Sequence, residues 1–223
     1  NIIDITDKTN PIKISSFHTG NYSMGVAVSG DYAYATDEGR GLRIIDISDP
    51  YAPTEVGSSS RNVFEAIAVS SGYAYIAGME FYIFDVSDPT TPIEVVSYDT
   101  PGSLRNIAVD GKYVYVADGD MGLRILDVSS STNLFEVGFY DTDGRAYGVT
   151  VSGDYAYIAD GEMGLRVLDI SDPTSPYEAG FYDTEGFAYD VIKNNDYIYV
   201  ADYRGGLYII QNDLITDQQP EHF

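Results

Sequence analysis

The stretch ADGEMGLRVLDISDPTSP, at residues 159–176, closely repeats ADGDMGLRILDVSSSTN, at residues 117–133, 42 positions earlier. Its clearest landmark is the aspartate that follows the apolar run. This landmark recurs along the whole chain at Asp4, Asp46, Asp85, Asp127 and Asp169, with Gln211 in the last equivalent place. The spacings between these positions are 42, 39, 42, 42 and 42 residues. The chain is therefore built from one repeat of about 42 residues.

Each repeat contains four short runs with strand character. In the best-formed repeat these runs are AYGVTVSG, DYAYIADG, GLRVLDIS and PYEAGFYDT, at residues 146–153, 154–161, 164–171 and 176–184. They are rich in Val, Ile, Tyr and Phe and are separated by Gly, Asp, Ser and Pro, as strands and turns are. No window sustains a helical period. Four antiparallel strands, a to d, in a repeat of this length predict an all-β protein of β-propeller blades.

Three copies of the third strand carry a family resemblance. They read GLRIIDISDP, GLRILDVSS and GLRVLDISDP, at residues 41–50, 122–130 and 164–173, after DYAYATD, KYVYVAD and DYAYIAD. These phrases resemble LVIVD repeats, and the resemblance covers essentially the whole chain. It implies a propeller of a kind common in secreted or surface-attached bacterial and archaeal proteins, hence an extracellular or cell-surface location. It implies no single shared activity. The second repeat departs from the pattern, because AGMEFYIFD is two residues shorter.

Counting strands predicts five blades within residues 1–211, followed by a C-terminal tail at 212–223. The last blade would combine Ala188–Lys193, Tyr197–Asp202 and Leu207–Ile210 with Ile12–Phe17, so that strands from both termini close the ring and remove the open sheet edge. Residues 1–5 are then surplus. Either they pack beside the closing blade, or the chain is a fragment of a larger propeller. Because it begins at Asn1, we expect it to be processed or cut from a longer protein with further domains.

Composition narrows the function classes. The chain has 12 basic and 35 acidic residues, a net charge of −23 and no cysteine. This charge repels phosphate backbones and argues against nucleic-acid partners. No apolar run is long enough for membrane insertion. The two histidines, His18 and His222, fall in a loop and in the tail, so they predict no histidine-based catalytic triad or zinc site.

The aspartates and arginines that recur in successive repeats predict turns and packing, because a residue needed once for chemistry is not needed in every blade. A ligand site is better sought where the repeat varies. Two columns of the innermost strand vary while their neighbours stay uniform. They contain Met24, Glu65, Arg105, Tyr147 and Tyr189, and Gly25, Ala66, Asn106, Gly148 and Asp190.

Chain direction places both variable columns near the mouth of the channel, on the face formed by the b–c and d–a loops. Convergent polar groups in a concave place predict a ligand-binding site, here formed by Met24, Glu65, Arg105, Asn106, Tyr147, Tyr189 and Asp190. The alternative is that Glu65 and Arg105 merely pair across adjacent blades and that the tyrosines fill the channel.

The loops of the same face are acidic. Clustered carboxylates beside glycine turns suit Ca²⁺, and the candidate ligands are Asp118, Asp160, Asp202, Asp141 and Asp183. A solvated acidic rim is the alternative, and the sequence contains no calcium loop of EF-hand type. It indicates no other cofactor.

The sequence thus favours a non-enzymatic propeller that presents an acidic loop face to a protein or a glycan. The alternative is a glycoside hydrolase or lyase that uses two carboxylates at the channel mouth, Glu65 and Asp190. A lectin with several equivalent sites is disfavoured, because the candidate residues differ between repeats.

Overall fold

The computed structural model describes residues 1–61, 63–130 and 133–211 of the chain. The tail predicted at 212–223 lies outside these residues. In the described part every regular element is a β-strand, so the all-β prediction is confirmed, and no helix there is long and apolar enough to span a membrane. The chain divides into two compact units, Asn1–Ser97 and the remainder from Tyr98 onward.

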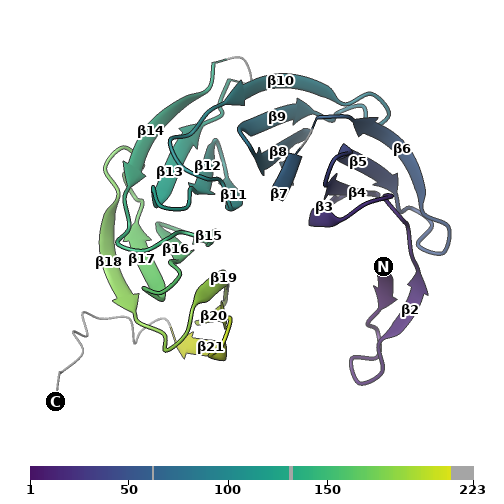
Figure 1. The fold of residues 1–223 in the computed structure, drawn as a ribbon. Coiled ribbons are helices and arrows are strands. Elements are labelled where there is room, and N and C mark those ends of the chain that lie inside the picture. Colours follow the sequence, from purple (N-terminus) through teal and green to yellow (C-terminus); the bar gives the residue numbers. More distant parts are fainter. Residues whose placement is uncertain (62, 131–132, 212–223) are drawn as a thin grey trace. The chain divides into compact units, whose positions relative to one another are not determined.

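The first unit contains a hairpin and two four-stranded antiparallel sheets (Figure 1). The hairpin pairs β1 (Ile2–Asp4) with β2 (Ile12–Ser15). The next sheet has the order β3 (Ser23–Ser29), β4 (Tyr32–Asp37), β5 (Gly41–Asp46) and β6 (Thr54–Ser59). The following sheet contains β7 (Val63–Ser70), β8 (Tyr73–Gly78), β9 (Phe81–Asp85) and β10 (Ile93–Tyr98), in the same a-to-d order.

The second unit contains two further four-stranded sheets and one of three strands. One sheet consists of β11 (Asn106–Asp110), β12 (Tyr113–Ala117), β13 (Leu123–Asp127) and β14 (Phe135–Tyr140). Another consists of β15 (Gly148–Ser152), β16 (Tyr155–Ala159), β17 (Leu165–Asp169) and β18 (Tyr177–Tyr182). The three-stranded sheet consists of β19 (Ala188–Asn194), β20 (Tyr197–Asp202) and β21 (Gly206–Gln211).

The predicted turns follow from local chemistry. The first residue of every a–b turn has a positive φ of 50–60°, and it is Gly30, Ser71, Gly111, Gly153 and Asn195 in the successive repeats. Glycine adopts this conformation without steric cost, and asparagine tolerates it. After each third strand the repeated aspartate closes a turn of its own. In one copy Asp46 accepts hydrogen bonds from the backbone N–H and the hydroxyl of Ser48, at 2.9 and 2.6 Å.

The N-terminal hairpin has the register of a c–d pair. Asp4 faces Ile12 just as Asp46 faces Thr54. In both hairpins the register shifts between the two residues that precede the aspartate, Ile2 and Ile3 in one and Ile44 and Ile45 in the other. The same shift occurs in β13–β14 and in β17–β18. The strand predicted at Ile12–Phe17 therefore exists as β2, but its described partner is β1. The pairing that would complete the last blade remains a prediction.

Successive sheets within each unit pack face to face. In the first unit, Tyr34, Leu42 and Ile44 of one sheet form a core with residues of the next that include Ile76 and Phe84. The innermost strands of neighbouring sheets contact each other, β3 with β7, and β15 with both β11 and β19. This arrangement of four-stranded repeats is β-propeller-like.

Candidate functional site

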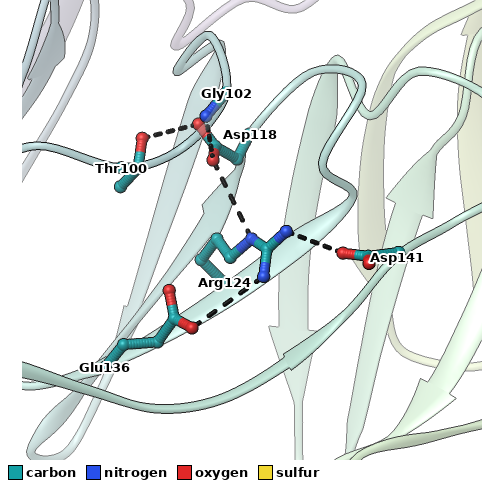
Figure 2. Close-up of polar contacts among 6 residues, drawn as sticks. All are labelled: Thr100, Gly102, Asp118, Arg124, Glu136 and Asp141. Carbon is teal, nitrogen blue, oxygen red and sulfur yellow. Dashed lines mark hydrogen bonds and ion pairs between the residues drawn. The ribbon is translucent and has the colours of Figure 1, made fainter.

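A fully buried aspartate ends the second strand of several sheets. Figure 2 shows the copy at Asp118, whose carboxylate accepts a hydrogen bond from the Thr100 hydroxyl at 2.7 Å and one from the Gly102 N–H at 2.9 Å. Thr100 and Gly102 lie in the loop that enters the sheet. The aspartate therefore connects the d–a loop to the end of β12, which is a structural task that recurs with the repeat.

Arg124, on β13, lies among three carboxylates (Figure 2). Its guanidinium is 2.6 Å from an Asp141 oxygen, 3.8 Å from Glu136 and 3.9 Å from Asp118. The guanidinium carbon of Arg124 also lies 4.6 Å from the ring centre of Phe139. The next repeat reproduces this arrangement: Asp160 bonds Thr142 and Gly144, and Arg166 lies near Asp160, Asp183 and Phe181.

The aspartates predicted as calcium ligands are engaged by protein donors. Asp141 and Asp183 pair with Arg124 and Arg166, and Asp202 accepts hydrogen bonds from the N–H groups of Phe187 and Gly205 at 2.7 and 3.1 Å. Within the described ranges, no group of three or more His, Asp or Glu side chains is placed to hold a metal ion.

In the shorter second repeat, the arginine that other repeats have on the third strand is absent, and an arginine from a loop takes its place. Tyr82 stands on β9 where other repeats have Arg43, Arg124 or Arg166. Arg61, from the preceding loop, lies over the Tyr82 ring and binds both carboxylate oxygens of Glu94, at 2.7 and 3.0 Å. Glu94 occupies the place on β10 that Glu136 has on β14. The glutamate of the fourth strand thus keeps an arginine partner that comes from another segment.

In the second unit, three residues of the variable column meet. The rings of Tyr147 and Tyr189 are stacked, with centres 5.2 Å apart and planes 28° apart. The guanidinium carbon of Arg105 lies 5.7 Å from the centre of the Tyr147 ring. Arg105 and Tyr147 immediately precede β11 and β15, and Tyr189 lies on β19, so the residue types that differ between repeats contact one another at the starts of the innermost strands.

Two further residues, which lie outside the two variable columns, join them. Phe187 meets the Tyr147 ring edge-on at a centre separation of 5.0 Å, and the Arg145 guanidinium lies 5.5 Å from the same ring centre. Arg145 also lies 3.4 Å from Asp120. We call Arg105, Arg145, Tyr147, Phe187 and Tyr189 the arginine–tyrosine cluster. Phe187 and Arg145 each lie two residues before a member of the variable column, which is the signal that could have found them.

The other predicted site residues are distributed over both units. Met24 is exposed on β3, and Glu65 is half-buried on β7, both in the first unit. In the second unit, Asn106 begins β11 and faces Ala117, and Asp190 lies on β19 against Gly148. Partial desolvation of the Asp190 carboxylate raises its pKa, although a hydrogen bond from the Val191 N–H partly offsets this effect.

Two groups of acidic side chains have opposite pKa shifts. Desolvation raises the pKa of Asp118, Asp160, Asp190, Glu136 and Glu178. Hydrogen bonds from a serine hydroxyl and N–H at the turns lower the pKa of Asp46, Asp85, Asp127 and Asp169 below the usual 3.8.

We expect the free energy of unfolding to be greater at pH 5 than at either pH 7 or pH 3. Groups with raised pKa values take up protons in the folded state first, so stability rises as the pH falls from 7 through their folded pKa values. The turn aspartates act oppositely, and their contribution is lost as the pH falls below 3.8. Urea unfolding at pH 3, 5 and 7 measures this profile. A free energy that increases from pH 5 to pH 7 would contradict it.

Comparison with known proteins agrees with this repeat architecture. The LVIVD repeat family matches residues 20–60, 65–100, 101–142, 143–184 and 185–211. No curated protein matches the chain. The solved structure of a functionally unknown protein from Desulfotomaculum acetoxidans DSM 771 is similar, with a TM-score of 0.72 and 13% identity over 87% of this chain and 71% of that one.

The crystal structure of the computationally designed Ika8 protein is also similar, with a TM-score of 0.67 and 8% identity over 85% of this chain. This chain spans 58% of the designed one. At such identities the two structures support the fold alone. The family match, in contrast, extends from residue 20 to residue 211 and contains the quoted GLRIIDISDP, GLRILDVSS and GLRVLDISDP phrases. The chain belongs to the LVIVD repeat family.

Proposed function

We propose that the protein is a non-enzymatic, extracellular or cell-surface binding module whose ligand, a protein or a glycan, contacts the arginine–tyrosine cluster. One observation carries the proposal: residues released from the repeat pattern gather around a single ring, Tyr147, with Arg105 at 5.7 Å and Tyr189 stacked at 5.2 Å. A mixture of aromatic faces and guanidinium donors offers both stacking and hydrogen bonding to a ligand.

A hydrolytic function is the second candidate. It rests on Asp190, whose desolvated carboxylate has a raised pKa, as a general acid requires. The second carboxylate of such a pair would be Glu65. None of the five residues of the cluster is a carboxylate, whereas such hydrolysis ordinarily needs two, and this favours binding without turnover.

Substituting Tyr189→Ala tests the binding proposal. Because this side chain is 56% exposed, we expect its loss to leave the fold intact and to reduce binding at least about tenfold on an immobilised glycan and peptide panel. Tyr203→Ala is the matched control, since Tyr203 is 80% exposed and lies outside the cluster. Equal binding by both variants would contradict the proposal. Release of reducing sugar from a bound glycan would instead support the hydrolase.

We also propose that the repeats close into a five-bladed ring. Two columns of apolar residues are buried in the interior sheets. One of them is exposed in the sheet that begins with β3, and the other is exposed in the sheet that ends with β21. Val26 on β3 is 70% exposed, whereas its equivalent Val149 is 4% exposed. Leu207 on β21 is 63% exposed, whereas Leu42 is fully buried. In the interior cores these two columns pack against each other, so closure would bury both remaining faces.

The absence of cysteine permits a direct test of closure. We expect the double variant Val26→Cys, Leu207→Cys to form an intramolecular disulfide in the monomer, because interior residues of these columns share a core. Cross-linked dimers, or two thiols that remain free, would contradict closure and favour a fragment of a larger propeller. Non-reducing electrophoresis with mass spectrometry distinguishes these outcomes.

Deletion of residues 1–18, which removes the closing strand, should cause association or melting.

A further inference from the structure

We infer that Lys13 of β2 is the cation that neutralises the buried carboxylate of Asp202, and that this ion pair makes β2 of the same chain the fourth strand of the last sheet. This pairing rests on the ring closure proposed above and names the residues that select the closing strand. Three observations carry it: the surroundings of Asp202, a change of charge in the repeat columns of β2, and the contact of Ser15 with Pro50.

Asp202 is a buried carboxylate with an unsatisfied oxygen. It ends β20 in the place that follows β12 at Asp118 and β16 at Asp160, and it is only 1% exposed. Its Oδ1 accepts the hydrogen bonds from the N–H groups of Phe187 and Gly205. Its Oδ2 has no hydrogen-bond partner among the residues that the structure describes. A buried carboxylate oxygen without a donor or a cation is costly, so this place requires a partner.

The arginine that accompanies such an aspartate elsewhere is absent from the last sheet. Tyr208 occupies the arginine column, because it lies opposite β20 in the register in which Arg124 lies opposite β12. Its hydroxyl accepts a hydrogen bond from the Glu185 N–H at 3.2 Å. A tyrosine supplies no positive charge, so β21 offers Asp202 no counterpart of the 3.9 Å contact between Arg124 and Asp118.

The segment that contains β2 differs from the other fourth strands in the opposite sense. Its register places Lys13 in the column that holds a glutamate in every other fourth strand. These glutamates are Glu55, Glu94, Glu136 and Glu178. In the loop after β2, His18 stands in the place of Asp141 and Asp183, the other carboxylates that pair with a strand arginine. The segment without these carboxylates therefore matches the sheet without the arginine, and its lysine supplies the missing cation.

β2 already has the place of a fourth strand beside the sheet that begins with β3. The Ser15 hydroxyl donates a hydrogen bond to the carbonyl oxygen of Pro50, in the c–d turn of that sheet, at 2.6 Å. Ser15 stands in the column of Gly57, which lies against Pro89 in the c–d turn of the following sheet. A fourth strand thus contacts the turn of the sheet that follows its own. In a closed ring, the sheet before that of β3 is the last one.

The competitor of β21 for this strand is β1. The pairing of β1 with β2 covers only Ile2–Asp4, and their two-stranded sheet contains no counterpart of β20 and hence none of Asp202. β21 extends over Gly206–Gln211 and is an edge strand of its three-stranded sheet. Exchange of β1 for β21 gives β2 a longer partner, covers an open sheet edge and forms the ion pair between Lys13 and Asp202.

Charge reversal in the whole chain tests the ion pair. Lys13→Glu should raise the unfolding equilibrium constant at least about tenfold in urea, because it replaces the cation beside Asp202 by another carboxylate. Lys8→Glu is the matched control, since Lys8 is exposed in the turn of the same hairpin and its reversal alters the net charge equally. The control should change the constant less than about threefold. Circular dichroism of each variant shows whether it is folded before urea is added.

A second substitution should rescue the first. Lys13→Glu combined with Tyr208→Arg rebuilds the arrangement of Glu136, Arg124 and Asp118 (Figure 2). In the Tyr208→Arg background, Lys13→Glu should therefore change the unfolding equilibrium constant less than about threefold, as a coupling between adjacent residues predicts.

The outcomes separate the ion pair from ring closure. Equal effects of Lys13→Glu and Lys8→Glu, with a Val26–Leu207 disulfide that forms in the monomer, would overturn the ion pair and leave closure standing. A loss at Lys13 that Tyr208→Arg does not reduce would also overturn the ion pair. An effect of Lys13→Glu that depends on protein concentration would overturn the assignment to the same chain and indicate β2 of a second copy. Absence of both the disulfide and the coupling would overturn closure as well.

Discussion

Replacement of Arg124 by alanine is expected to lower the free energy of unfolding by about 3–5 kcal/mol at pH 7, as the loss of one partner of a buried ion pair does. Arg124 lies within 3.9 Å of Asp118 and 3.8 Å of Glu136, and its side chain is only 7% exposed. Without the guanidinium, Asp118 keeps its hydrogen bonds to Thr100 and Gly102 but loses its positive partner in a place with no access to water.

The pH dependence of this loss identifies its cause. Desolvation already raises the pKa of Asp118 and Glu136, and Arg124 opposes that rise. The variant should therefore protonate both groups at a higher pH than the unmodified protein does. Since protonation removes the unpaired charge, the difference in unfolding free energy should shrink as the pH falls from 7 toward 4. Urea unfolding of both proteins across this range provides the measurement.

Arg61 in the second repeat offers a matched control. It forms a two-point contact with Glu94, but its side chain is 57% exposed, so water stabilises both charges when the pair is broken. Arg61→Ala should cost no more than about 1 kcal/mol. Similar losses for Arg61→Ala and Arg124→Ala, or a loss at Arg124 that does not depend on pH, would show that packing rather than buried charge determines the effect.

The repeat architecture could be predicted from the sequence because each of its signals is local. A turn of two or three residues, such as Ser152 to Asp154, contains its own conformational requirement at Gly153. The spacing of Asp46, Asp85, Asp127 and Asp169 repeats a turn that each aspartate closes with the serine two residues later. Such features need no knowledge of the rest of the chain.

Features that depend on partners from another segment were not predictable in this way. Arg61 is one example. It lies in the loop before β7, whereas the arginine that it replaces lies on the third strand in other repeats, so the two positions do not align in the sequence. The pairing of β1 with β2 is another. The landmark at Asp4 already marked residues 1–5 as a surplus third strand, but only the pairing of Ile2–Asp4 with Ile12–Ser15 shows which strand is its partner.

The candidate site was predictable only in part, because some of its residues share a repeat column and others join it only through contacts between segments. Arg105, Tyr147 and Tyr189 share one column of the repeat, so aligning the copies was enough to select them. Arg145 and Phe187 lie in the d–a loops, two residues before that column, and these two loops align without a gap. Their place in the cluster depends on the contacts of one ring, Tyr147, with residues from two loops.

Neighbouring sheets fit together through the repeated c–d turn. Gly138, on β14, lies against the c–d turn of the next sheet, and a β-carbon added there would stand 2.1 Å from the Pro173 carbonyl oxygen. Gly57 in the first unit has the same relation to Pro89, also at 2.1 Å. The repeated turn is thus an element of inter-sheet packing, and the glycine opposite it is required by lack of space.

We expect Gly138→Ala to lower the free energy of unfolding by about 3 kcal/mol, because rigid backbone on both sides must move apart to admit the methyl group. Gly57→Ala should behave alike. Gly153→Ala is the control: its φ is +60° but nothing lies within 4 Å of the added carbon, so only backbone strain of about 1 kcal/mol applies. A cost at Gly138 no larger than at Gly153, measured by urea unfolding, would mean that the turn yields easily and that the two sheets do not depend on it for their packing.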